Sequence, residues 1–199
     1  MTIKVGITGG MGSGKSTVCK IFKLLGAPVF EADVVAKQLL NTHPEIKSGL
    51  VRLFGKGIYM QDGTIDRKKL AGIVFNDEIQ LANMNRLVHP VVREEFNKWH
   101  EKQQAAYIIH EAAILFESGF YKMMDFTLLI SAPEQQRIER VIKRDEVREQ
   151  QVLERINRQW PDEKKRKLAS LEIINDNTHL IIPAIIEIDK KLKQYGKIW

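Results

Sequence analysis

One short stretch near the N-terminus has the residue types and the spacing that phosphate chemistry needs. It reads Gly9-Gly10-Met11-Gly12-Ser13-Gly14-Lys15-Ser16-Thr17 and fills every fixed position of the pattern G-x-x-x-x-G-K-[ST]. The glycines let successive backbone N–H groups turn toward one anion, and a following helix adds the positive end of its dipole. The pattern predicts that Lys15 reaches the β- and γ-phosphates of ATP and that the Ser16 hydroxyl ligates Mg²⁺. We therefore expect Gly10 to Thr17 to bind the nucleotide.

The residues on either side of this loop form the strand–loop–helix context that the motif requires. Residues 3–8 are typical of a short buried strand, and apolar residues recur at helical spacing after the loop, at Val18, Ile21, Phe22 and Leu25. Gly26 is a natural end for this helix. The alternative, a glycine-rich hairpin with an incidental lysine, does not account for this order of elements.

The composition is that of a single domain, with room for a small inserted subdomain. Of the 199 residues, 44% are hydrophobic and 28% are charged, which provides a core and a polar surface. The single cysteine, Cys19, excludes an internal disulfide framework, and we expect it to be a buried apolar side chain. No apolar run reaches the length of a membrane span and no signal peptide is recognisable. We expect a cytoplasmic protein with no membrane partner.

The formal net charge of +6 raises the alternative of a nucleic-acid partner. Much of the excess lies in residues 137–167, which hold eleven Lys or Arg and seven Asp or Glu residues. A local basic cluster in a chain with a phosphate loop is better explained as a clamp on polyphosphate. No nucleic-acid recognition motif accompanies it, so we expect no nucleic-acid partner.

The rest of the chain alternates strands and helices, which predicts an α/β fold with a parallel sheet. The predicted strands after the first are a short one ending at Asp33, then residues 107–111, 126–130 and 171–174. Helices are predicted after Pro133, over 148–158, after Pro161 and over 181–195. Ligands of parallel sheets bind at the carboxyl ends of the strands, where the loop, Asp33 and Glu111 emerge.

Residues 34–103 read as helices alone. Pro44 suits the first turn of one helix, Asp66 and Asn76 are expected caps of two more, and His89-Pro90 marks a break before the last. About seventy residues of helix are too many for an ordinary crossover between two strands. We therefore expect an inserted helical substrate subdomain.

Other motifs in the chain help to distinguish a GTPase, a motor ATPase and a small-molecule kinase. The N-K-x-D motif of GTPases is absent, and the apolar strand ending at Glu111 matches a motor ATPase only weakly. A small-molecule kinase needs an acid near the acceptor hydroxyl, an acceptor pocket, and arginines that neutralise the migrating phosphoryl group. Arg137, Arg140 and Arg144 are spaced to share one side of a helix, opposite its apolar stripe.

A series of short motifs, in order along almost the whole chain, resembles the dephospho-CoA kinase family, which completes coenzyme A biosynthesis. The matching segments are Thr8 to Ser16, Glu31-Ala32-Asp33, Phe54-Gly55, Asp62 to Arg67, Leu70, Val74-Phe75, Leu87 to Pro90, Leu115-Phe116-Glu117, Arg144-Asp145, Arg155, Gln159 and Ile174-Asn175. The resemblance implies ATP-dependent phosphorylation of the ribose 3′-hydroxyl of dephospho-CoA. It also implies a P-loop NTPase-type core (1–33, 104–135 and 170–199), a helical CoA-binding subdomain (34–103) and a helical lid (136–169).

Position and resemblance together assign roles to individual residues. Asp33 is the expected catalytic acid–base group, against the alternative of a helix N-cap. Arg140 is the expected lid arginine on the transferring phosphoryl group, with Arg144 as a second nucleotide contact; the alternative for both is a solvated helix face. Asn175 ends the stretch that matches the family's nucleotide-binding loop.

Several alternatives stay open at this stage. Glu111, where the family often has Asp, either holds the Mg²⁺ shell through water or caps the next turn. Phe75, Phe96 and Trp99 either line a channel for the pantetheine arm or pack in the core, and His89 reads as structural. The rival functions are a kinase of a nucleoside monophosphate or another small alcohol, and a nucleotide-dependent regulatory or RNA-binding protein. We expect a monomer, with an oligomer left open.

Overall fold

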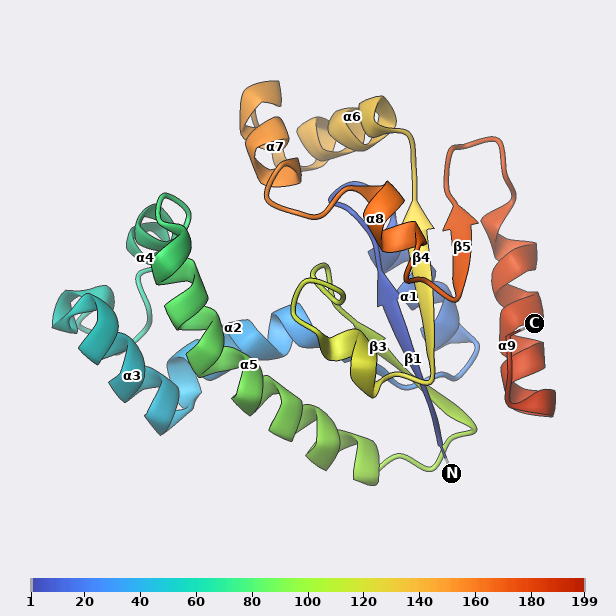
Figure 1. The fold of residues 1–199 in the computed structure, drawn as a ribbon, viewed down its shortest axis with the longest axis horizontal. Coiled ribbons are helices and arrows are strands. Elements are labelled where there is room, and N and C mark those ends of the chain that lie inside the picture. The colour runs from blue at the N-terminus through green and yellow to red at the C-terminus, as the bar shows by residue number, and fades with distance from the viewer. Residues whose placement is uncertain (1, 199) are drawn as a thin grey trace. The chain divides into compact units, whose positions relative to one another are not determined.

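The computed structural model describes residues 2–198, and its elements are drawn in Figure 1. The strands are β1 (Ile3–Thr8), β2 (Val29–Glu31), β3 (Tyr107–Glu111), β4 (Phe126–Ser131) and β5 (Leu171–Ile174). The helices are α1 (Lys15–Leu24), α2 (Ala32–Thr42), α3 (Pro44–Phe54), α4 (Arg67–Val74), α5 (Glu78–Glu101), α6 (Glu134–Asp145), α7 (Glu149–Ile156), α8 (Asp162–Arg166) and α9 (Ile181–Tyr195), with short 3-10 helices η1 (Lys56–Ile58) and η2 (Phe120–Met123).

The five strands form one sheet in the order β2-β3-β1-β4-β5, and all neighbouring pairs are parallel. This confirms the predicted parallel α/β sheet. The strand that leads into the phosphate-binding loop, β1, lies in the middle, between β3 and β4. Its loop therefore emerges at the centre of the carboxyl edge, where the neighbouring strands also end.

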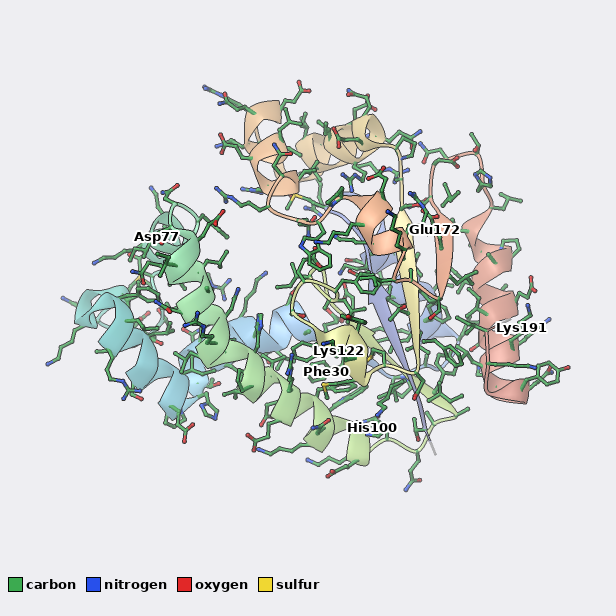
Figure 2. The ribbon with its side chains drawn as sticks, in the orientation of Figure 1. Phe30, Asp77, His100, Lys122, Glu172 and Lys191 are labelled. Atoms are coloured by element: carbon green, nitrogen blue, oxygen red, sulfur yellow. The ribbon has the colours of Figure 1, made fainter. Side chains whose placement is uncertain are left out.

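One face of the sheet is covered by α1 and α9. Val5 and Ile7 point to this side and pack with Phe22 of α1 and Ile185 of α9 in a continuous buried core. Figure 2 shows side chains filling the space between the sheet and α9. On the opposite face a Cβ added to Gly6 would lie 2.7 Å from Leu115, so the segment after β3 covers the sheet closely there. The core thus fixes β1 and α1, the two elements that flank the loop.

The second strand is shorter than predicted. The expectation that it ends at Asp33 is wrong: β2 ends at Glu31, and Asp33 lies in the first turn of α2 with an exposed side chain. β2 pairs only with β3, and their pairing stops at Glu31 opposite Glu111, the last residue of β3. The chain turns into helix once its partner strand ends.

The chain divides into two compact units. The sheet unit comprises Met1–Glu31 and Lys102–Trp199, and the helical unit comprises Ala32–Glu101. The boundaries expected from the sequence, after residues 33 and 103, each lie two residues beyond the observed ones, after residues 31 and 101. Assignment of the helical unit to CoA and of residues 136–169 to a lid stays a prediction.

Local signals account for most helix ends of the helical unit. Pro44 is in the first turn of α3, and the Asp66 carboxylate accepts the Lys69 N–H at 2.9 Å to cap α4, both as predicted. The predicted cap of α5 is wrong by one residue. Asp77, labelled in Figure 2, accepts the N–H groups of Ile79 and Gln80, whereas the Asn76 side chain donates back to Gly72.

The predicted break at His89-Pro90 is also wrong, because α5 continues through Pro90 to Glu101. A proline inside a helix removes one backbone hydrogen bond and costs about 3 kcal/mol. Three buried side chains of α5, Val88, Val92 and Phe96, flank or follow this position, and their burial offsets that cost. Among residues 2–198, neither α5 nor any other helix has both the length and the apolar character to cross a bilayer.

Candidate active site

The phosphate-binding loop runs from the end of β1 at Thr8 to the start of α1 at Lys15. Its turns require glycine at two positions, since Gly12 has φ 79° and Gly14 has φ 91°. A Cβ added to Gly14 would also lie 2.1 Å from the Asn175 amide nitrogen. The Gly14 carbonyl accepts the N–H groups of Thr17 and Val18, which begins α1 directly behind the loop. A loop that leads into a helix N-terminus in this way suits an anion.

The loop lysine has a carboxylate partner. Lys15 Nζ forms an ion pair with Glu111 Oε1, and only 12% and 11% of the two side chains are exposed. The parallel register aligns Glu111, the last residue of β3, with Ile7 of β1, which brings its carboxylate to the loop. Neither role that we considered for Glu111 included this pair. A nucleotide phosphate would compete with the carboxylate for the same ammonium group.

Two oxygen donors suited to Mg²⁺ accompany Lys15: Ser16 follows it in the chain, and Glu111 is its ion-pair partner. Ser16 is exposed in the first turn of α1, so its hydroxyl is open to a ligand, and Glu111 supplies a carboxylate. Within residues 2–198, no group of three or more His, Cys, Asp or Glu side chains is arranged to hold a metal ion by itself. These donors fit a hard cation whose shell is completed by phosphate oxygens and water.

Arg140 and Asn175 reach the loop from two other elements. The Arg140 guanidinium donates to the carbonyl oxygens of Gly12 at 3.4 Å and Asn175 at 2.9 Å, and to Asn177 Oδ1 at 2.8 Å. Asn175 in turn donates from Nδ2 to the Ser13 carbonyl at 2.8 Å. The sheet unit therefore brings two of the predicted site residues, from α6 and from the end of β5, onto the loop backbone.

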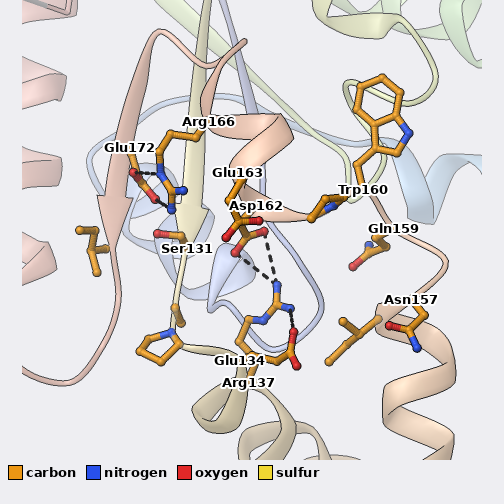
Figure 3. Close-up of a pocket in the computed structure, with 15 residues that line it drawn as sticks. Ser131, Glu134, Arg137, Asn157, Gln159, Trp160, Asp162, Glu163, Arg166 and Glu172 are labelled. Atoms are coloured by element: carbon orange, nitrogen blue, oxygen red, sulfur yellow. Dashed lines mark hydrogen bonds and ion pairs between the residues drawn. The ribbon is translucent and has the colours of Figure 1, made fainter.

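The three arginines of α6 lie at helical spacing on one side of the helix, but their environments differ. Arg137 is only 6% exposed, and its Nη1 lies 3.3 Å from Asp162 Oδ2 (Figure 3). A Cβ added to Gly10 would lie 1.9 Å from the same Nη1, so the guanidinium rests against the loop. Arg144, at the other end of the helix, has a side chain that is 64% exposed and pairs with Asp145. Because the N-terminal half of α6 lies over the loop, the face opposite its apolar stripe is not one solvated surface.

Asp162 occupies an unusual position for a carboxylate. Burial raises its pKa, and the nearby charges of Arg137 and Lys165 oppose that rise. The Arg137–Asp162 pair and a second pair, Arg166–Glu172, line a cavity of about 480 Å³ between α6, the α7–α8 linker and β5 (Figure 3). These pairs tie α8 to α6, through Arg137, and to β5, through Glu172.

Gln159 is a loop contact to which the sequence analysis assigned no role. Its Oε1 accepts the backbone N–H of Met11, one of the variable positions of the motif, at 2.9 Å. The signal that could have identified it was present, because Gln159 is one of the positions that carry the family resemblance. Asp33, the predicted catalytic residue, belongs to the helical unit, and its role stays a prediction.

The parallel sheet, the central loop and the partly buried loop lysine define the class of P-loop kinase folds. Shikimate kinase from Acinetobacter baumannii has this fold, with a TM-score of 0.55 at 16% identity over 100% of this chain and 97% of that one. The crystal structure of TT1252 from Thermus thermophilus agrees better, with a TM-score of 0.80 and 34% identity over 91% of each chain.

Sequence comparison names the family within this class. The dephospho-CoA kinase from Bacteroides fragilis is 38% identical over 94% of this chain and 92% of its own length. The dephospho-CoA kinase family model matches residues 3–180. The chain belongs to the dephospho-CoA kinase family, as the resemblance in the sequence predicted.

Proposed function

We propose that this protein transfers the γ-phosphoryl group of ATP to the ribose 3′-hydroxyl of dephospho-CoA, giving coenzyme A and ADP. The observation that carries the proposal is the loop around Lys15: glycine turns, a helix N-terminus and a largely buried ammonium group meet at one point. Membership of the dephospho-CoA kinase family supports the choice of acceptor.

The donor side of the reaction uses residues of the sheet unit. The loop from Gly10 to Thr17 holds the phosphates through backbone N–H groups other than those of Met11, Ser13 and Thr17, which are bonded within the protein. Lys15 leaves Glu111 to neutralise the β- and γ-phosphate oxygens. Arg140, already bonded to the loop carbonyl of Gly12, lies close enough to the loop to stabilise charge that develops on the migrating group. Asn175 orders the loop beneath the nucleotide, and Arg144 is an outer nucleotide contact.

The acceptor side uses Asp33. Its carboxylate accepts, or orients, the proton of the 3′-hydroxyl as the oxygen attacks phosphorus, so the ribose oxygen becomes nucleophilic only when the geometry is in line. The helical unit supplies the surface for the rest of dephospho-CoA. Ser16 would hold Mg²⁺, with Glu111 nearby, and the ion would supply positive charge to neutralise the phosphate oxygens.

The setting of this proposed reaction follows from its reactants. ATP and dephospho-CoA are both soluble small molecules, so we assign the reaction to the cytoplasm, without a membrane or nucleic-acid partner. We propose separately that the protein acts as a monomer. A size-exclusion experiment coupled to light scattering, at the concentrations used for kinetics, checks the oligomeric state.

A panel of acceptors tests the proposal directly. Purified protein with ATP and Mg²⁺ is given dephospho-CoA, AMP, CMP or shikimate, and ADP release is followed together with the mass of the product. We expect rapid ADP release only with dephospho-CoA, and a product with one added phosphate at the 3′ position by ³¹P NMR. Turnover on a nucleoside monophosphate or shikimate alone would assign a different acceptor.

The same assay separates the proposal from the regulatory or RNA-binding alternative. That alternative predicts slow ATP loss that ignores every acceptor, together with polynucleotide binding that weakens steeply with salt. Salt-independent turnover that requires dephospho-CoA would exclude it.

A further inference from the structure

Met11 is held by the lid region through both its backbone and its side chain. Its N–H donates to Gln159 Oε1 at 2.9 Å. Its side chain packs against the small apolar cluster between α6 and α7, which includes Val141, Val152 and Ile156. The motif allows any residue at this position and requires neither contact. The two contacts of Met11 therefore need a separate explanation.

The segment that carries Gln159 is itself firmly attached. The next N–H, that of Trp160, donates to Glu117 Oε1 at 3.0 Å, and Glu117 lies 3.3 Å from Lys165 Nζ. The Lys165 side chain is fully buried, so this ion pair is shielded from water and salt. The linker of residues 157–161 is therefore bonded to the segment after β3, which fixes the backbone next to Gln159.

A second tie runs from the same segment to the neighbouring loop residue. Asp162, at the start of α8, holds the Arg137 guanidinium, which rests against Gly10. Figure 3 shows this pair and Gln159 on the α7–α8 linker. Residues 159–162 thus act on Gly10 through Arg137 and on Met11 directly.

We propose that Gln159 is a positioning residue: its side-chain oxygen fixes the Met11 peptide and so sets the arc Gly10–Gly12 for phosphoryl transfer. This rests on the proposed function above. A peptide in a glycine-rich loop is free to rotate unless its N–H has a partner. Rotation of the Met11 peptide would turn the amides beside it away from the transferring group, and small misalignments of this kind lower kcat steeply.

Two variants separate the acceptor atom from the bulk of the side chain. Gln159→Met keeps the length and volume but removes the acceptor for the Met11 N–H. Gln159→Glu keeps the acceptor and adds a negative charge near the phosphates. Gln135→Met is the matched control, because Gln135 is exposed on α6 and its side chain donates to Glu139 on the same helix.

We expect Gln159→Met to lower kcat by about 10- to 100-fold with little change in the KM for ATP, since ground-state contacts to the nucleotide remain. Gln159→Glu should retain more of kcat than Gln159→Met but raise the KM for ATP through charge repulsion. Gln135→Met should match the wild type. Thermal melting of each variant, with kcat expressed per folded site, separates these effects from loss of folded protein.

Hydrogen exchange of the Met11 amide gives a reading that needs no substrate. Exchange should become about tenfold faster in Gln159→Met and stay slow in Gln159→Glu and Gln135→Met. Wild-type kcat in Gln159→Met, or unchanged Met11 exchange in that variant, overturns the positioning role. A wild-type protein that fails to phosphorylate dephospho-CoA, yet shows the exchange difference, overturns the proposed acceptor and leaves the Gln159–Met11 contact standing.

Discussion

The phosphate-binding loop and the helical unit are held in place by contacts of different range. The loop is fixed by side chains far away in the sequence: Gln159 on Met11, Asn175 on Ser13, and Arg140 on Gly12. In the helical unit, the caps of α4 and α5 lie within three residues of the groups that they cap. A substitution near the loop should therefore disturb function through distant partners, whereas one in the helical unit should mostly change local stability.

Asp33 is the strongest expected exception to this contrast, because it belongs to the helical unit and yet should control turnover. Asp33→Asn keeps the shape of an exposed first-turn residue but removes the base, so we expect kcat to fall about 1,000-fold with an unchanged melting temperature. Steady-state kinetics with dephospho-CoA and thermal denaturation check both parts. The control is Glu45→Gln, in the first turn of α3, which should behave as wild type. Wild-type kcat in Asp33→Asn would remove the catalytic assignment.

The stability of the sheet unit should depend on pH through a buried histidine. His110 lies between the rings of Phe30 and Phe120, and burial, with a smaller effect of Lys15, lowers its pKa to about 4 from the ordinary 6.5. The unfolded chain therefore binds this proton more readily. The contribution of neutral His110 to the free energy of unfolding is complete above pH 6.5. It is lost as the pH falls toward 4, and the loss is at most about 3 kcal/mol.

Urea unfolding between pH 4.5 and 7.5 measures this contribution. The wild type should lose stability steadily on the acid side of pH 6.5, and His110→Phe, which cannot bind a proton, should lose less over the same interval. Parallel curves for the two proteins would show that His110 does not titrate as its burial requires.

Gly14→Ala tests the long-range side of the comparison. The new methyl group would meet the Asn175 amide nitrogen at 2.1 Å, in a residue whose φ of 91° already disfavours a side chain. We expect the loop to shift and kcat/KM for ATP to fall about 100-fold. Calorimetric titration with ADP checks the nucleotide site directly. Asn175→Ala in the same chain relieves the clash but not the backbone strain, so it should restore part of the affinity.

Substitutions of Arg140 and Arg144 in α6 should change kcat less than Gly14→Ala changes kcat/KM. Arg140 bonds to the loop and to Asn175, whereas Arg144 pairs with its neighbour Asp145 in solvent. Replacing Arg140 by Lys loses the fixed fork of donors and should lower kcat about tenfold, more than it changes the KM for ATP. Arg144→Lys should have a smaller effect. Equal effects of the two substitutions would mean that the contacts of Arg140 with the loop and with Asn175 do not persist during turnover.

The contrast in range also explains how much could be predicted from the sequence. Periodicity gave the bounds of β1, β3, β5 and α9 correctly, because apolar spacing reports directly on a buried face. The loop residues followed from a motif of fixed spacing. The helix through Pro90 was missed because tertiary burial outweighed a local signal, and the Asp77 cap because two cap-forming residues are adjacent.

The partners of the loop were beyond this kind of reasoning for a different reason. Spacing on α6 placed Arg137 and Arg140 on one side of a helix, but could not say whether that side faces water or the loop. The Lys15–Glu111 pair depends on strand order, which brings β3 beside β1. Only the assembled sheet contains that information.

Gly72→Ala should have the smallest effect of these substitutions, and it should be a gain, in the free energy of unfolding, rather than a loss. Gly72 is an exposed residue within α4 of the helical unit, and a Cβ added there would meet no atom within 4 Å. Replacing glycine by alanine in a helix should stabilise the protein by about 0.5–1 kcal/mol, because the unfolded chain loses freedom and no contact is disturbed. Urea unfolding should show this gain with kcat unchanged. The same chemical change that disables the loop at Gly14 should thus strengthen the helical unit, and a loss of stability in Gly72→Ala would show that this unit, too, depends on contacts beyond its local helical signals.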